Sequence, residues 1–300
     1  MRGLTRPPVL KPDPASDPAS GRASVPESGR ASDPAPVPES DPGPPSVPDP
    51  ALGRAADPAA PILEEIAPGA VWVHPYPVRY AFATFSARMT LIRLRDGRVI
   101  VHSPGPLDED LKRAIAAVGP VGWIVAPGTF HHLHAGDAAR AYPEAQVLIC
   151  PGVERKQPDL AYDALLGADP PADWAGEIAL QPVLDNRVIR EVVLLHIPSR
   201  TLIVTDLIEL IGDATPGVDR VLRFWWKWLT FMWNKPRPAP EYTLGWTNRR
   251  AAAVSLERIL GWDFDRIVLA HGDLVLENAK SVARQAWARV LRHGSGSRPG

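Results

Sequence analysis

The stretch V-G-W-I-V-A-P-G-T-F-H-H-L-H-A-G-D, residues 121–137, decides how the rest of the chain is organised. Its apolar first part, up to Val125, predicts a short buried strand, and its second part predicts a loop that holds His131, His132 and His134. A strand fixes the backbone from which such a loop starts, so the loop can direct several imidazole nitrogens at one point. The stretch therefore predicts a metal site supported by a sheet.

The first fifth of the chain has a different composition from the remainder. Residues 1–61 are rich in Pro, Ser, Asp and Ala, and they repeat short units such as S-G-R-A-S and V-P-E-S. Such a segment has almost no large apolar side chains to bury, so nothing offsets the entropy that it would lose on ordering. We predict a disordered tail at residues 1–61, a single folded domain at residues 62–292, and a frayed tail at residues 293–300.

Charge and cysteine content exclude several classes of function. The formal net charge of -1 gives no general attraction to nucleic acid, so we expect no nucleic-acid partner. Cys150 is the only cysteine, which excludes an intramolecular disulfide and a thiolate metal cluster and suits a reducing compartment. No run reaches the roughly 18 apolar residues of a membrane span, and the first residues lack the apolar core of a signal peptide. These features predict a cytoplasmic protein without a transmembrane segment.

The order of the predicted elements indicates a layered α/β fold. Asp96-Gly97 lies between two β-rich runs and predicts a hairpin, and a second hairpin is predicted to turn at residues 198–200. Helical spacing of apolar residues predicts helices that begin near Asp108 and that occupy residues 247–260 and 279–291. Hairpins come first and strand-helix units follow, so both antiparallel and parallel pairs are expected.

Four side chains near predicted strand ends form the candidate metal site. His132 and His134 are two residues apart, so in an extended loop both would point the same way. Asp206 and His271 each follow an apolar strand, and their side chains meet if those strands are neighbours. Three nitrogens and one carboxylate suit zinc or iron, and a bound ion polarises an ester, amide or phosphoester oxygen. The alternative is that these are ordinary polar residues that cap strands and helices.

The motifs around these residues resemble the metallo-β-lactamase superfamily. The resemblance rests on H-L-H-A-G-D at residues 132–137, T-D at 205–206 and A-H-G at 270–272. Four further motifs are similar to an uncharacterised bacterial domain-of-unknown-function family of that superfamily: V-H-S-P (101–104), A-Y-P-E-A (141–145), P-S-R-T-L-I-V-T-D (198–206) and W-D-F-D-R-I-V-L-A-H-G-D (262–273). The resemblance covers about residues 66–291. It implies a four-layer αββα sandwich and metal-dependent hydrolysis.

Departures from the superfamily pattern imply a degenerate site. The pattern H-x-H-x-D-H would require Asp and His where this chain has Gly136 and Asp137, and a histidine expected within residues 186–190 is missing. The resemblance therefore implies at most one ion, zinc or iron, rather than a two-metal centre. Its ligands would be His132, His134, Asp206 and His271. Asp137 is the nearest candidate for a base that activates the attacking water.

Three other histidines receive separate expectations. His102, in V-H-S-P, could line the same site because the corresponding strand of the superfamily ends there. His196 is expected at the opposite end of its strand, and His74 is expected to be structural.

A tryptophan-rich segment, R-F-W-W-K-W-L-T-F-M-W-N-K-P-R, occupies residues 223–237. It is too short to span a bilayer, and its aromatic residues surround the predicted helix instead of forming a stripe. Three interpretations stay open: a lid over the site, a docking surface for another subunit of a homo-oligomer, or a peripheral membrane anchor. The anchor would consist of Trp225, Trp226, Trp228 and Trp233.

The sequence thus predicts a hydrolase of a small ester, thioester or phosphoester that acts through a single metal ion. The alternative is a non-catalytic protein that binds a ligand or partner on the same fold, with peripheral membrane contact through the tryptophan-rich segment. The missing second-metal ligands motivate that alternative. No G-x-S-x-G, G-x-x-x-x-G-K-S/T or G-x-G-x-x-G motif is found in the folded domain, so neither a serine nucleophile nor a nucleotide cofactor is implied.

Overall fold

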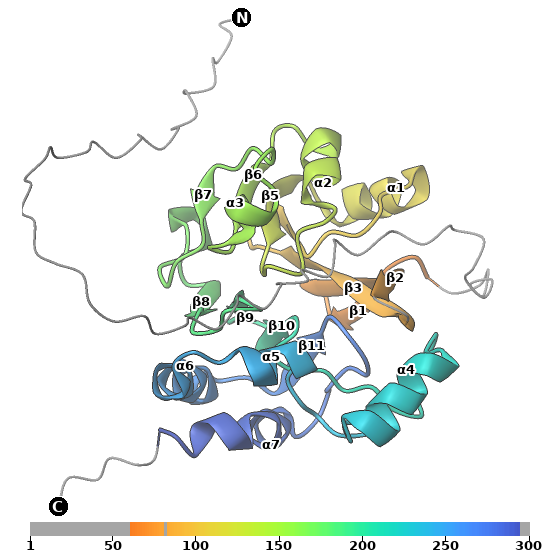
Figure 1. The fold of residues 1–300 in the computed structure, drawn as a ribbon. Helices are drawn as coiled ribbons and strands as arrows, with labels where there is room; N and C mark the ends of the chain where they lie inside the picture. The colour runs from red at the N-terminus through yellow and green to blue at the C-terminus, as the bar shows by residue number, and fades with distance from the viewer. Residues whose placement is uncertain (1–60, 81–82, 295–300) are drawn as a thin grey trace, which may run out of the picture. The chain divides into compact units, whose positions relative to one another are not determined.

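A computed structural model of the chain describes residues 61–80 and 83–294. The predicted disordered tail at residues 1–61 lies almost entirely outside the described residues. The same holds for most of the predicted C-terminal tail at residues 293–300. The described residues form two β-sheets that are covered by helices (Figure 1).

The larger sheet has seven strands that follow one another in chain order, β1-β2-β3-β4-β5-β6-β7. They are β1 (Glu64–Ala67), β2 (Val71–Tyr80), β3 (Ala83–Arg93), β4 (Val99–His102), β5 (Val121–Ala126), β6 (Gln146–Ile149) and β7 (Ala164–Leu165). β1 to β4 pair antiparallel and β4 to β7 pair parallel, as expected for hairpins followed by strand-helix units. Gly97 takes a positive φ of 89° in the β3–β4 turn, which confirms the predicted Asp96-Gly97 hairpin.

The smaller sheet has the order β11-β10-β9-β8. Its strands are β8 (Ile178–Val183), β9 (Glu191–His196), β10 (Thr201–Val204) and β11 (Arg266–Leu269). β8, β9 and β10 pair antiparallel, whereas β10 and β11 are parallel neighbours with Val204 opposite Leu269. The residues that follow these two strands therefore leave the sheet at the same edge. Asp206 and His271 can meet only in this arrangement.

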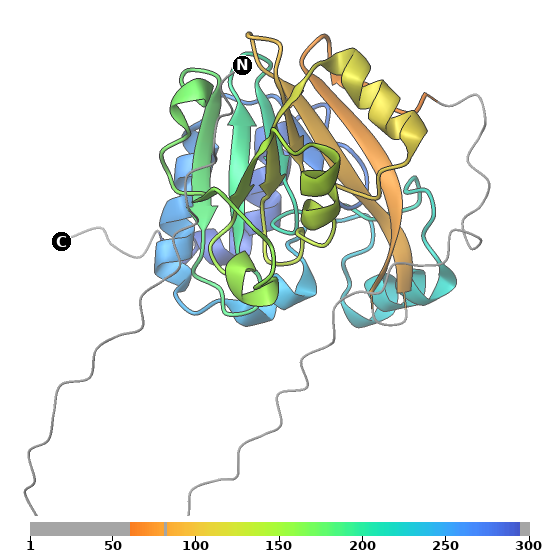
Figure 2. The same cartoon turned by 90° about the horizontal axis from the view of Figure 1, so that it is seen from above.

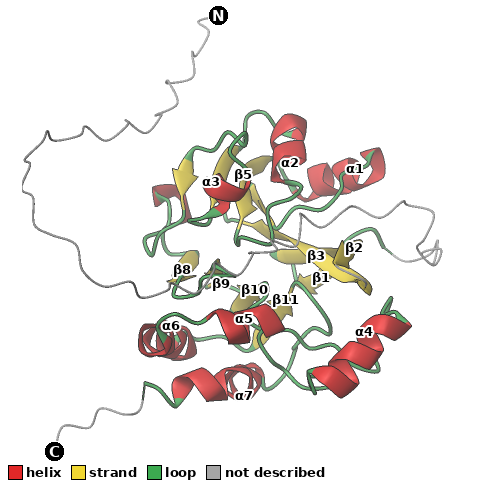
Figure 3. Ribbon diagram, in the orientation of Figure 1, coloured by secondary structure: helices red, strands yellow, loops and turns green. Residues whose placement is uncertain are grey.

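Helices cover the outer face of each sheet, so the domain has the four layers of an αββα sandwich (Figures 1 and 3). On the larger sheet lie α1 (Glu109–Val118), α2 (Ala135–Ala141) and α3 (Val153–Lys156). On the smaller sheet lie α6 (Arg249–Gly261) and α7 (Ala279–Leu291). A short 3-10 helix, η2 (Ala172–Trp174), precedes β8.

Alternating side chains along the strands explain this layering. One buried cluster joins Ile92 of the larger sheet to Leu194, Ile203 and Val268 of the smaller sheet. The side chains next to these along the smaller sheet face the opposite way and pack with α6 and α7; they are Val193, Leu195, Leu202, Val204, Ile267 and Leu269. At about 25 cal/mol for each Å² of buried apolar surface, these two interfaces supply the main stabilisation of the sandwich.

The tryptophan-rich segment lies between β10 and β11 in the chain. It forms α4 (Arg220–Phe224), which continues into a π-helix, η3 (Trp225–Leu229), and is followed by α5 (Pro240–Gly245). Figures 1 and 2 both place α4 beside the ends of β2 and β3, and Thr84 N–H donates to Asp219 Oδ2 at 2.6 Å. Within the described residues, no helix combines the length and the apolar character that crossing a membrane requires.

One buried histidine of the smaller sheet should make stability depend on pH. His196 ends β9 opposite Thr201, at the end of the sheet away from Asp206, as the sequence predicts. Burial, together with the charge of Arg95, lowers the pKa of His196 to about 4. The folded protein buries His196 in its neutral form. Its contribution to the free energy of unfolding is therefore fully present above the unfolded pKa of about 6.5 and is lost as pH falls towards 4.

We expect the free energy of unfolding to fall by about 1–2 kcal/mol between pH 7 and pH 5 on account of His196. Urea unfolding at the two pH values measures this difference. His196→Gln should reduce the pH dependence by that amount, whereas His293→Gln, at an exposed position, should leave it unchanged. An identical pH dependence in the His196→Gln variant and the unaltered protein would contradict the assignment.

Candidate metal centre

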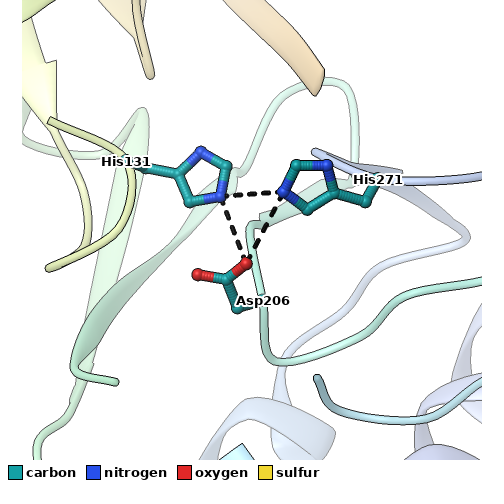
Figure 4. Close-up of side chains that lie close together, drawn as sticks. All are labelled: His131, Asp206 and His271. Atoms are coloured by element: carbon teal, nitrogen blue, oxygen red, sulfur yellow. Dashed lines mark hydrogen bonds and ion pairs between the residues drawn. The ribbon is translucent and has the colours of Figure 1, made fainter. Parts of the chain in front are cut away.

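Three buried side chains from three separate loops converge between the two sheets. His131 follows β5, Asp206 follows β10 and His271 follows β11. His131 Nε2 lies 3.2 Å from Asp206 Oδ1 and 3.2 Å from His271 Nε2, and His271 Nε2 lies 3.6 Å from Asp206 Oδ1 (Figure 4). The three potential ligand atoms all lie within 4.8 Å of one another, which is a spacing that one metal ion can bridge.

The other ring nitrogen of each histidine is already engaged, which orients the ring. His271 Nδ1–H donates to the carbonyl oxygen of Ser86 at 3.1 Å, so its Nε2 presents a lone pair to the centre. His131 Nδ1 is hydrogen bonded to the Ser103 hydroxyl at 2.8 Å. Hydrogen bonds of this kind select the tautomer and the direction of metal-binding histidines.

A non-glycine residue in a left-handed conformation supports this arrangement. Ser103 has a φ of 52°, which is unfavourable for a side chain with a Cβ. Such strain persists only where surrounding contacts over-determine the backbone, and it concentrates at functional sites. Here the strained residue, Ser103, is the one whose hydroxyl group is hydrogen bonded to the ring of His131.

The charges of the group favour a bound cation. Burial acts to lower the pKa of His131, but the adjacent Asp206 carboxylate outweighs burial and the pKa is raised. Burial acts to raise the pKa of Asp206, yet His131 holds it below its usual value. The pKa of His271 is lowered to about 4 by burial and by His131. The Asp206 carboxylate thus favours positive charge beside it, and a metal ion between the carboxylate and the two rings would supply that charge.

An unsatisfied carboxylate oxygen gives a second test of whether these residues fit a metal. Within the described part of the chain, Asp206 Oδ2 is buried and has no hydrogen-bond partner. A buried carboxylate oxygen without a partner costs a few kcal/mol, and coordination to a cation removes that cost. The donor set, two imidazole nitrogens and a carboxylate, is one that zinc and iron accept. The residues present therefore fit a single ion.

Glu191, the first residue of β9, holds the turn that carries Asp206. Its carboxylate accepts backbone N–H groups from three successive residues, at 2.9 Å from Thr205, 3.0 Å from Asp206 and 2.9 Å from Leu207. Glu191 also bridges to Gly128, on the loop that leads to His131. It is fully buried, and burial together with the Asp206 charge raises its pKa to about 7. Glu191 thus connects two of the three loops of the centre, the turn after β10 through its side chain and the loop after β5 through its backbone.

The structure brings Asp206 and His271 together, whereas His132 and His134 lie outside the group. The prediction for the two histidines required an extended loop. Instead the loop turns, because Ala135 N–H donates to His132 O at 3.0 Å and His134 precedes the first residue of α2. The turn separates the directions of the two side chains, and His131 is the histidine that reaches Asp206. Metal ligation by His132 and His134 therefore stays a prediction.

Both of these histidines nevertheless line the cavity in front of the centre. His132 Nδ1 is buried without a hydrogen-bond partner among the described residues. His134 Nδ1 lies 3.7 Å from Asp137 Oδ2, and its ring packs edge-on against Tyr76 with ring centroids 5.8 Å apart. They can contact a bound ligand without contacting the same ion as His131.

The remaining predicted residues lie around the centre. Asp137 lies in the first turn of α2, pairs with Arg140 and is not among the described residues that line the cavity, so its role as a base stays a prediction. His102 is buried close to His131, and burial followed by the His131 charge lowers its pKa to about 3. His74 Nδ1 is hydrogen bonded to Ile62 O at 2.7 Å, and His74 is not among the described residues that line the cavity.

The cavity beside the centre has mainly aromatic and aliphatic walls. Its described lining includes Tyr76, Val78, Phe85, Phe130, Leu222, Trp225 and Trp226 together with the three residues of the centre. Besides Asp206, two carboxyl groups reach it, from Glu209 and Glu241. No Lys or Arg belongs to this lining in the described structure.

Glu209, like Glu191, is a residue of the site that the sequence patterns do not identify. Within the described structure its Oε2 is buried and has no hydrogen-bond partner, and burial together with Asp206 raises its pKa well above the usual value. Both Glu191 and Glu209 interrupt apolar runs, and a charged residue in a buried run requires a partner or a function. The sequence therefore contained a sign that these two residues are special, but it did not indicate which groups they contact.

Glu191→Ala should leave three buried N–H groups without an acceptor and lower the free energy of unfolding by about 3–5 kcal/mol. Urea unfolding measures the loss, and hydrogen exchange should show residues 205–207 losing protection first. Glu257→Ala, at an exposed position of α6, is the matched control and should change stability by less than about 0.5 kcal/mol. Unchanged protection of residues 205–207 in Glu191→Ala would refute the role of Glu191.

Known structures share this fold at low sequence identity. The chain is similar to a metallo-β-lactamase from Pontibacter korlensis, with 11% identity, a TM-score of 0.51, and coverage of 78% of this chain and 99% of that one. A metallo-β-lactamase from Erythrobacter litoralis matches with 15% identity, a TM-score of 0.52, and coverage of 78% and 96%. The mono-zinc form of the Pseudomonas aeruginosa metallo-β-lactamase FIM-1 matches with 11% identity, a TM-score of 0.51, and coverage of 78% and 96%. At these identities the similarity is one of fold.

Sequence comparisons define the family. A search of curated protein sequences found no significant match. The sequence profile of the family described as domain of unknown function (DUF4336) matches residues 68–224, more than half of the chain. The chain therefore belongs to the DUF4336 family, and its described residues have the fold of the metallo-β-lactamases.

Proposed function

We propose that this domain is a metal-dependent hydrolase in which His131, Asp206 and His271 hold one zinc or iron ion. The observation that carries the proposal is the convergence of three buried ligand atoms within 4.8 Å, with both histidines oriented through Nδ1. When bound, such an ion polarises a carbonyl oxygen and lowers the pKa of a coordinated water towards about 7. The protein contributes the orientation of the ligands and a cavity that excludes bulk water.

The cavity favours an uncharged ester or thioester over a phosphoester. Its apolar walls suit a hydrocarbon or aromatic substituent, and the carboxylates of Asp206 and Glu241 would repel a phosphate dianion. A site for phosphate would be expected to include Arg or Lys, which the described lining does not contain. Of the three substrate classes predicted from sequence, the two uncharged ones fit this chemistry.

Glu209 is the best-placed proton donor in the cavity. Burial raises the pKa of its carboxyl group well above the usual value, which favours the neutral form, and its Oε2 has no hydrogen-bond partner among the described residues. A neutral carboxylic acid in an apolar site can donate a hydrogen bond to a carbonyl oxygen or a proton to a leaving group. We assign it this role in place of Asp137, which pairs with Arg140.

The alternative function is non-catalytic binding of a ligand or partner. It is motivated by the absence of the superfamily's second-metal ligands at Gly136 and Asp137. A homo-oligomer and a cytoplasmic location are further predictions from the sequence. Metal content and turnover separate the two functions.

We expect elemental analysis of the full chain, purified without a metal-binding tag, to find about one zinc or iron ion per molecule. His131→Ala or Asp206→Ala should abolish binding, and Ser103→Ala should weaken it by about 10-fold through the loss of the hydrogen bond to His131. His74→Ala, outside the described lining of the cavity, is the matched control. His132→Ala and His134→Ala test the original ligand prediction. Metal-free protein after dialysis against zinc would overturn the proposal and favour the binding function.

Hydrolysis of p-nitrophenyl butyrate should exceed that of p-nitrophenyl phosphate, should stop with a chelator and should return with zinc. Glu209→Leu should lower the rate with the butyrate ester by about 100-fold because it removes the donor. Glu209→Gln retains a hydrogen-bond donor without a transferable proton, so it distinguishes the two roles. Glu257→Leu, on the exposed face of α6, should have no effect. Equal rates for Glu209→Leu and the unaltered enzyme would exclude Glu209 from the reaction.

A further inference from the structure

The outer surface of the tryptophan-rich segment carries a run of large exposed apolar side chains. Within residues 221–231 five such side chains have between 49% and 64% of their surface exposed: Val221, Phe224, Trp228, Leu229 and Phe231. We refer to these five residues as the apolar patch. Exposed apolar residues scattered singly are ordinary, but a contiguous group on one short segment marks a surface that binds something.

The patch is held outward by a packed underside. Leu222, Trp226, Met232 and Trp233 turn inward and form a buried cluster with Ile211. Asp219 caps α4 by accepting from Leu222 N–H at 2.6 Å, and Trp233 Nε1 donates to Asp213 Oδ1 at 3.2 Å. The segment is therefore a folded element with an anchored inner face.

The structure also corrects which tryptophans could reach a partner. Trp226 and Trp233 are buried, and Trp225 lines the cavity. Of the four tryptophans predicted to form a membrane anchor, only Trp228 belongs to the patch. Phe231 joins it through a left-handed backbone conformation with a φ of 56°, which is strained for an aromatic residue.

The surroundings of the patch are basic. Between Asp219 and Glu241 the chain contains no acidic residue and five basic ones: Arg220, Arg223, Lys227, Lys235 and Arg237. Arg220 and Lys227 are exposed and form no ion pair within the described part of the chain. Asp213, which interacts electrostatically with Arg223 and Lys227, is also hydrogen bonded to Trp233 and Asn234.

This combination identifies the kind of partner. Two copies of the chain that met through this patch about a two-fold axis would bring like charges together, which disfavours self-association. An anionic bilayer offers apolar contact for the aromatic and aliphatic side chains and negative headgroups for the basic ones. We infer that the apolar patch and its flanking basic residues dock the protein on an anionic lipid surface.

Docking through this face would place the cavity next to the lipid. Leu222, Trp225 and Trp226 form part of the cavity wall, and they belong to the same α4–η3 element whose outer side carries the patch. A substrate with an acyl chain would then have a short route from the bilayer to the cavity. The membrane contact itself does not depend on metal binding or hydrolysis, so the two proposals fail separately.

Co-sedimentation of the full chain with sucrose-loaded vesicles tests the inference. Binding to phosphatidylcholine vesicles that contain about 30% phosphatidylglycerol should be at least 10-fold tighter than binding to pure phosphatidylcholine, because anionic lipid attracts each basic side chain near the surface. Binding should weaken as the salt concentration rises.

Matched variants assign the binding to the patch. The triple variant Phe224→Ser, Trp228→Ser, Leu229→Ser should lower affinity for anionic vesicles by more than 10-fold. The control Val254→Ser, Leu276→Ser removes exposed apolar residues elsewhere and should leave it unchanged. Arg220→Glu with Lys227→Glu should remove the preference for anionic lipid. Circular dichroism and thermal unfolding verify that each variant is folded.

A spectroscopic readout separates insertion from simple adsorption. Trp228 should move into the headgroup region, so tryptophan emission should shift to shorter wavelength on addition of anionic vesicles. Trp228→Phe should keep vesicle binding and lose most of the shift. Absence of binding, or equal pelleting of the triple variant and the unaltered chain, would overturn the inference. So would a dimer in sedimentation velocity that the triple variant converts to a monomer, which would assign the patch to self-association.

Discussion

The buried carboxylate of Glu191 is the constraint on which the candidate centre depends. It accepts three successive backbone N–H groups after β10 and so determines where Asp206 lies. Its own residue bridges to Gly128, which precedes the loop of His131. Burying a carboxylate is costly, and three backbone hydrogen bonds to it offset much of that cost. The carboxylate and the three N–H groups depend on each other, because removing either would leave the other buried without a hydrogen-bond partner.

The two layers of strands supply a rigid frame around this unit. Apolar side chains such as Ile92 and Leu194 fill the space between the sheets, whereas the polar groups gather where the strands end. Parallel pairing of β10 with β11 brings Asp206 and His271 to the same edge, and the loop after β5 completes the group. A cation at this place would bind both ring nitrogens and Asp206 Oδ1. Polar groups that are costly to bury thus lie together at the candidate centre, where a bound cation would lower that cost.

The tryptophan-rich segment links this centre to the protein surface. Its inner face contributes Trp225 and Trp226 to a cavity with carboxyl groups and no basic side chain in the described lining. Its outer face presents Trp228 and Phe231 among basic residues. The inner face thus borders a cavity with carboxyl groups, and the outer face lies among basic residues, so the two faces differ in electrostatic character. The π-helical geometry of Trp225–Leu229 shifts the side-chain directions that an α-helix would have given.

Local sequence patterns predicted most of the strands, the Asp96-Gly97 hairpin and the strand ends that carry Asp206 and His271, because strand ends and turn residues depend mainly on neighbouring residues. The sandwich itself was implied by the resemblance of the motifs to a known superfamily. The choice of His131 over His132 and His134 came from the tertiary structure. Contacts with β9 bend that loop into a turn, and alternation along an extended chain no longer applies. The roles of Glu191 and Glu209 likewise required the structure, since a carboxyl group acquires its partners and its protonation from residues distant in the chain. The same reason explains why composition alone could not distinguish the buried tryptophans from the exposed one.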